Sequence, residues 1–113
     1  MPPPTSAIVS QSITALHRWA RFAERYWWQA PDRSDLGCFG TGYNNWGVQT
    51  NQKYLAAMAI LACQPEPTFD NHYSRDHAFS RALTALRFSL ATHVTGDYRC
   101  TDGTQWGHTW ISG

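Results

Sequence analysis

Two stretches of the chain, sixty residues apart, share the same Trp-Gly pair. Residues 44–51 read NNWGVQTN, and residues 104–111 read TQWGHTWI. Each stretch follows a loop that contains glycine and aromatic residues, and we expect each to open a helix. A Trp-Gly pair at the start of two successive helices predicts a repeat of helical hairpins with an aromatic, polar rim.

The segments around these pairs have the periodicity of helices. Residues 6–29 carry an apolar stripe at steps of three and four residues, formed by Val9, Ile13, Leu16, Ala20, Ala23 and Trp27. The next helix, residues 49–62, is apolar on every side, which is typical of a helix surrounded by other helices. Ser74 is the expected N-cap of a third helix that reaches His93, with an apolar stripe of Phe79, Leu83, Leu86 and Leu90. Gly96 is expected to stop that helix, and a fourth helix is expected to begin near Gln105.

An amphipathic helix, a glycine-rich loop and an apolar helix therefore follow one another twice. We predict an all-α fold of helical hairpins that forms a segment of an α/α toroid, an incomplete ring. Residues 1–5 are expected to be a disordered lead, and residues 6–113 a single helical domain of about two hairpins, a fragment of a larger toroid. Because an isolated unit of a repeat array leaves an apolar face uncovered, a homo-oligomer through that face is a further expectation.

The composition excludes several partners. Charged residues make up 15% of the 113 residues and the net charge is +1, so no basic field indicates nucleic acid. The longest apolar run, residues 54–63, is too short to span a membrane. Residues 1–4 lack the pattern of a signal peptide. The location stays open between the bacterial cytoplasm and, for a chain with a shortened N-terminus, the periplasm or the exterior.

The three cysteines are odd in number and show no CxxC spacing, which argues against a disulfide framework and against a zinc site. Cys38 and Cys100 each lie in the loop before a Trp-Gly pair, so the sequence leaves open whether they meet. His72, Asp76 and His77 match no zinc spacing. We predict neither a metal nor another cofactor.

The six Trp residues either form an aromatic core or line a cleft for a ring-shaped ligand such as a sugar. The first Trp-Gly stretch also concentrates amides beside Tyr43, namely Asn44, Asn45, Gln49, Asn51 and Gln52. Amides bind hydroxyls and carboxylates, and a helix N-terminus favours an anion; the alternative is that these residues only cap the helix. In the second stretch Asp102, Gln105 and His108 are candidates, with His108 either a general base or a structural histidine.

The stretch FGTGYNNWG at residues 39–47, followed by QTNQK at residues 49–53, resembles bacterial heparinase II/III-like proteins. The later QWGHTWIS at residues 105–112 adds to the resemblance, which covers most of the chain after residue 15. Members of this family combine an α/α toroid with an antiparallel β-sandwich and cleave acidic polysaccharides by β-elimination. The resemblance implies a polysaccharide lyase-like segment for a uronate-containing polysaccharide. Since the chain matches only part of the toroid, we expect it to be inactive alone.

β-Elimination needs a group that neutralises the uronate carboxylate, a base for the C5 proton and an acid for the leaving oxygen. The resemblance assigns the first role to Asn44 or Asn45, and the other two to Tyr43 and His108. It makes sugar platforms of Trp46, Trp106 and Trp110. The further substrate contacts would come from Gln49, Asn51, Gln52, Asp102 and Gln105.

Two other functions stay open. A glycoside hydrolase toroid would need two carboxylates at the cleft, and Asp102 is the only acidic residue near a Trp-Gly loop. A non-catalytic helical module would bind carbohydrate or assemble with itself through its apolar face.

Overall fold

Three helices and one pair of short strands form the part of the chain that the structure describes. The computed structural model describes residues 4–44, 46–64 and 73–107, and for residues 4–10 the backbone alone. In chain order the elements are α1 (Pro4–Ala23), the 3-10 turn η1 (Glu24–Tyr26), β1 (Trp27–Gln29), β2 (Gly37–Phe39), α2 (Trp46–Ala62) and α3 (Arg75–Thr92).

The first helix is shorter than its sequence pattern predicts. We expected a helix as far as Gln29, but α1 ends at Ala23 and the chain passes through η1 into β1. Aromatic residues favour strands, and here Trp27 pairs with Phe39 in an antiparallel register. The two rings also meet edge to face, with centroids 5.0 Å apart. Pairing with a segment twelve residues away thus overrides the helical periodicity.

The hairpin of β1 and β2 is closed at both ends by backbone hydrogen bonds. The Gly40 N–H donates to the Tyr26 carbonyl at 2.8 Å, and the Ala30 N–H donates to the Leu36 carbonyl at 3.0 Å. The Gln29 side chain adds a donation to the Leu36 carbonyl at 2.7 Å. A strand pair this short is marginal by itself, so these bonds and the packing on α3 stabilise it.

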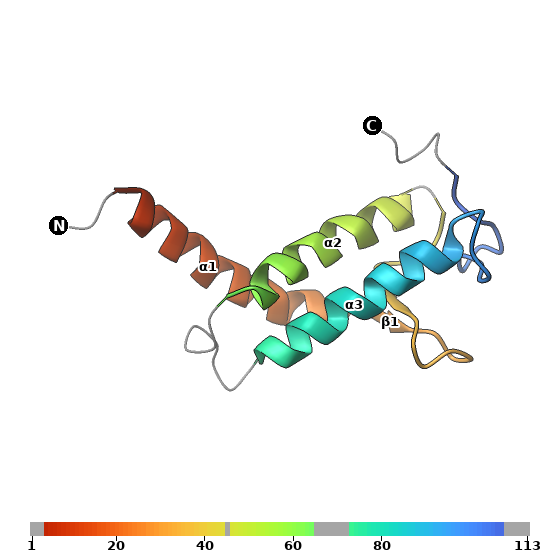
Figure 1. Ribbon diagram of the computed structural model, residues 1–113, viewed down its shortest axis with the longest axis horizontal. Coiled ribbons are helices and arrows are strands. Elements are labelled where there is room, and N and C mark those ends of the chain that lie inside the picture. The colour runs from red at the N-terminus through yellow and green to blue at the C-terminus, as the bar shows by residue number, and fades with distance from the viewer. Residues whose placement is uncertain (1–3, 45, 65–72, 108–113) are drawn as a thin grey trace.

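The helices α2 and α3 run antiparallel, side by side, as Figure 1 shows. Three of the six buried residues of α3 are alanines, and these small side chains belong to the same cluster as the buried residues of α2. The buried residues of this cluster include Met58 and Leu61 of α2, Ala78, Ala82 and Ala85 of α3, and Ala20 and Ala23 of α1. The end of α1 therefore packs across the helix pair.

The predicted all-α toroid segment is wrong. The chain forms a small mixed α/β structure with an antiparallel two-stranded sheet, and the described residues hold three helices rather than a repeated outer and inner pair. The first Trp-Gly pair does open a helix, α2. At the second pair the described residues 105–107 are not helical, and the expected fourth helix after Gly107 lies outside the described residues. Trp106 instead forms a parallel bridge with His93, donating its N–H to the Thr92 carbonyl at 3.1 Å.

The predicted burial pattern of the helices is also wrong. We expected residues 49–62 to be surrounded by other helices, yet the Ile60 side chain of α2 is 57% exposed. On α3 the apolar stripe is the exposed one, with Phe79 59% and Leu90 62% exposed. Periodicity marks an apolar face, but it does not say whether the chain itself covers that face.

The molecule is elongated, with principal extents of 54 × 31 × 20 Å. The N-terminal half of α1 extends away from the α2–α3 pair, at the left of Figure 1. The described α1 side chains that pack on the core lie in its second half, at Leu16, Trp19, Ala20 and Ala23. No described helix is long and apolar enough to cross a membrane.

Candidate functional sites

The loops that precede the two Trp-Gly pairs lie against each other. The Thr101 N–H donates to the Gly42 carbonyl at 2.8 Å, and the Thr101 hydroxyl donates to the Thr41 carbonyl at 2.7 Å. The Asn44 amide donates to the Thr104 hydroxyl and to the Gln105 carbonyl, each at 3.1 Å. We call residues 40–44 and 100–105 together the loop junction.

The sequence of the junction explains its shape. Gly42 has a φ of +73°, a conformation that side chains disfavour, and a methyl group there would meet the Thr101 methyl at 2.8 Å. In the second loop Thr104 donates its N–H and its hydroxyl to the Asp102 carboxylate, at 3.2 and 2.8 Å. Burial opposes ionisation of Asp102, but these hydrogen bonds outweigh it and lower the pKa of the carboxyl.

Large aromatic side chains stand exposed beside the junction. Tyr43 is 55% exposed and Trp46 is 74% exposed. The Tyr43 N–H donates to the Thr41 hydroxyl at 3.2 Å, which helps to hold the loop that carries the ring. The structure therefore brings together Tyr43, Asn44, Asp102 and Gln105 of the predicted site, with Trp46 following at the start of α2.

Three predicted contact residues, Gln105 among them, hold the fold through their side chains. Asn51 is 1% exposed and its amide joins three elements: it accepts from the Phe39 N–H and donates to the Ala85 carbonyl and the Ser89 hydroxyl. The Gln105 amide donates to the Tyr98 carbonyl at 2.9 Å. The Trp106 indole N–H donates to the Ser89 carbonyl at 2.9 Å.

The remaining predicted residues divide into two groups. Gln49 and Gln52 lie half-buried on α2. The other three lie outside the described residues, namely Asn45, His108 and Trp110. Two of the four predicted catalytic residues, Asn45 and His108, are in this second group.

The sequence did not predict a polar cluster that forms around Glu24. Its carboxylate accepts from the Arg81 guanidinium at 3.0 to 3.1 Å, contacts His77 Nε2 at 2.8 Å, and accepts from the Tyr73 hydroxyl at 3.3 Å. Burial opposes ionisation of Glu24, but Arg81 and His77 outweigh it and lower the pKa of the carboxyl. Arg81 also stacks on Trp27, with its guanidinium carbon 4.2 Å from the ring centroid.

The cluster is best explained as a clamp between the end of α1 and α3. Burial and the neighbouring Glu24 charge raise the pKa of Tyr73, so its hydroxyl stays a donor to the carboxylate. His77 and Arg81 are four residues apart on α3, a spacing that places them on one helix face. The spacing of His77 and Arg81 can be seen in the sequence. Their partner Glu24 cannot be predicted from it, because Glu24 lies fifty-three residues before His77.

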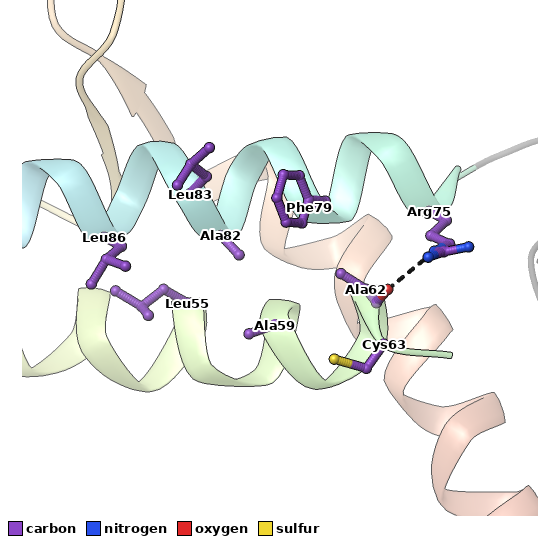
Figure 2. Close-up of a pocket in the computed structure, with 9 residues that line it drawn as sticks. All are labelled: Leu55, Ala59, Ala62, Cys63, Arg75, Phe79, Ala82, Leu83 and Leu86. Carbon is purple, nitrogen blue, oxygen red and sulfur yellow. Dashed lines mark hydrogen bonds between the residues drawn. The ribbon is translucent and has the colours of Figure 1, made fainter. Parts of the chain in front are cut away.

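A groove lined mostly by apolar side chains lies between α2 and α3. It has a volume of about 570 Å³, and Figure 2 shows its lining side chains extending from the two helices. The lining residues are Leu55, Ala59 and Ala62 of α2, Cys63 directly after it, and Arg75, Phe79, Ala82, Leu83 and Leu86 of α3. Among the described lining residues Arg75 alone is charged, and it lies at one end of the groove, where it donates to the Ala62 carbonyl at 3.3 Å.

The groove uses the apolar stripe that the sequence predicts on α3. Leu86 is 42% exposed, and Leu90, one turn further along, continues the stripe beyond the groove at 62% exposure. Scattered exposed apolar residues are normal, whereas a continuous exposed stripe on one helix is less common. We call the groove residues together with Leu90 the apolar face.

Comparison with known proteins leaves the family open. No family model matches the chain, and no curated protein or solved structure matches it either. The resemblance to heparinase II/III-like proteins therefore stays a prediction. Among the described residues, no group of three His, Cys, Asp or Glu side chains is arranged to hold a metal ion.

Proposed function

We propose that the chain is a self-assembling module whose apolar face packs against the same face of a second copy. The observation that carries this proposal is the exposure of the apolar stripe of α3, at Phe79, Leu86 and Leu90. A face without internal charge can meet itself without like-charge repulsion, as a two-fold symmetric dimer requires. Arg75 is at the end of the groove and leaves the centre of the face uncharged.

The dimensions of the face suit a dimer of moderate stability. The 18 residues of α3 span about 27 Å, and two helices side by side are about 20 Å wide. Two such faces bury roughly 1,000 Å² or more in total, which reaches the size of a specific interface. Since buried area alone does not set affinity, we take a dissociation constant on the order of micromolar as the value to test.

The test is the mass of the chain in solution as its concentration rises. Light scattering from about 5 to about 500 µM should show a change from monomer to dimer, the range that a micromolar constant requires. Leu86→Glu should shift the dissociation constant by tenfold or more, because it puts a charge in the centre of the apolar face.

A matched control separates the face from general effects of added charge. Ile60→Glu places the same charge at another exposed apolar position of the helix pair, one that does not line the groove. It should leave the dimer intact. A parent chain that stays monomeric throughout, or equal effects of the two variants, would argue against self-assembly through this face.

Carbohydrate binding at the loop junction is a second proposal. It is supported by the exposed rings of Tyr43 and Trp46, since flat aromatic faces with polar edges suit sugars. The family resemblance adds that the sugar would contain uronate. Without the toroid, the proposal is limited to binding, with β-elimination as a separate question for experiment.

A panel of acidic polysaccharides tests both parts. Binding should quench the fluorescence of the parent and be weakened by Trp46→Ala, while Trp28→Ala on β1 controls for general loss of aromatic signal. Growth of ultraviolet absorbance from unsaturated uronides would reveal elimination, and Tyr43→Phe and His108→Ala should then abolish it. No quenching with any glycan would remove this proposal.

A further inference from the structure

Two buried cysteines lie beside Gly42 of the loop junction. Cys38 of β2 is fully buried, and Cys100 is 2% exposed. Gly42 connects their positions: a methyl group on Gly42 would lie 3.3 Å from Cys38 Sγ, and the Gly42 carbonyl accepts from the N–H of Thr101, the residue after Cys100. Burial, and after it the charge of Cys100, raise the pKa of Cys38.

We propose that Cys38 and Cys100 form a disulfide under oxidising conditions and so lock the loop junction. The bond would join β2 to the segment after α3. It would lie next to the hydrogen bonds that Thr101 already makes with Thr41 and Gly42, in the loop that follows β2. Cys63 is excluded from this pair, because it is exposed in the apolar groove at the end of α2.

The surroundings of the two thiols favour Cys100 as the first to react. Burial raises the pKa of Cys38 to about 12, so this thiol stays protonated. Burial also raises the pKa of Cys100, but a hydrogen bond with the Thr92 side chain opposes this effect. Cys100 is moreover flanked by the exposed residues Arg99 and Thr101, so a small opening of the loop admits an oxidant.

Hydrogen peroxide is an oxidant of the required class. The Cys100 thiolate attacks one oxygen, the O–O bond breaks, and a sulfenic acid forms while the other oxygen leaves as hydroxide and takes up the thiol proton as water. The Cys38 sulfur then attacks the sulfenic sulfur. An S–S bond forms, the S–O bond breaks, and a second water leaves with the Cys38 proton. The two thiols lose two electrons and the peroxide gains two.

The experiment uses the Cys63→Ser chain, in which only the buried pair remains. After one equivalent of peroxide, the protein is unfolded in the presence of iodoacetamide and its intact mass is measured. We expect a loss of two hydrogens, no alkylation, and one peptide that joins Cys38 to Cys100. Closing a loop of this length should raise the unfolding midpoint by roughly 10 °C or more, and dithiothreitol should reverse the rise.

Two control chains carry Cys38→Ser or Cys100→Ser in addition to Cys63→Ser. Neither should show the peroxide-dependent rise in the unfolding midpoint. Alkylation of both thiols after peroxide, linkage between separate chains, or oxidation of Cys100 to a sulfinic acid would each overturn the proposal. If the internal bond forms and the unfolding midpoint does not change, the bond does not stabilise the loop junction and the proposal is contradicted.

Discussion

Single polar side chains connect elements that are far apart in the sequence. Asn51 joins β2, α2 and α3 through one amide, and Glu24 joins the end of α1 to α3 through one carboxylate. Each side chain has its donors or acceptors satisfied within the fold. Because an unsatisfied buried polar group is costly, removing either side chain should affect stability more than its size suggests.

Asn51→Ala should lower the free energy of unfolding by about 2–4 kcal/mol, because it leaves the Phe39 N–H and the Ala85 carbonyl without this partner. Urea titration followed by circular dichroism measures the loss. Gln52→Ala, at the next position of α2 and only half-buried, is the control and should cost less than about 1 kcal/mol. Equal losses of unfolding free energy in the two variants would mean that the Asn51 amide does not stabilise the contacts between these elements.

Glu24 makes the stability of the fold depend on pH. Its folded pKa lies below the ordinary value of 4.5, so its contribution is fully present above that pH and is lost as the pH falls through the folded pKa. Glu24→Gln should therefore destabilise the chain at pH 7, with a smaller difference from the parent at pH 3. Urea titrations at both pH values test this expectation, and a difference that does not shrink in acid would contradict it.

At the scale of elements, the sequence predicts features that depend on local contacts. The N-cap at Ser74 is confirmed, since its hydroxyl accepts from the His77 N–H at 3.1 Å. The end of α2 at Ala62 is confirmed as well. The predictions for the end of α1 and for Trp106 were wrong, because both depend on contacts that are remote in the sequence. Trp27 pairs with Phe39 of β2, and Trp106 bonds to Thr92 at the end of α3.

The candidate site, too, was predicted only in part. The sequence suggested that the two Trp-Gly loops belong together, and the hydrogen bonds of Asn44 do join them. It could not show that Asn51 points into the core, because an amide has the same chemistry in a cleft and between helices. Nor could it separate an apolar stripe that the chain covers from one that it leaves exposed.

Two glycines of the loop junction offer a matched test of its packing. Gly42 and Gly103 both have positive φ, +73° and +83°, but a side chain at Gly103 would meet no atom within 4 Å. Gly103→Ala should cost about 1 kcal/mol, for the backbone conformation alone. Gly42→Ala should cost more, since its methyl would also meet Thr101, and unfolding free energies of the two variants give the difference. Equal values would exclude a close contact between the loops.

At the scale of the whole molecule, stability is concentrated away from the free end of α1. Deleting residues 1–12 keeps Leu16 and Trp19, so the unfolding midpoint should change by about 4 °C or less. Deleting residues 1–20 removes both residues and Ala20, and should abolish or greatly lower the cooperative transition. Thermal melts of the two truncated chains measure this, and similar melts would show that α1 does not pack on the core as described.

The elongated shape has a consequence for how the chain moves through solution. A body of 54 × 31 × 20 Å diffuses more slowly than a sphere of the same mass. On a sizing column a lone copy would elute early and resemble a larger species. Elution volume alone would thus report a dimer where there is none, so sedimentation or scattered light, which yield mass independently of friction, must decide how many copies travel together.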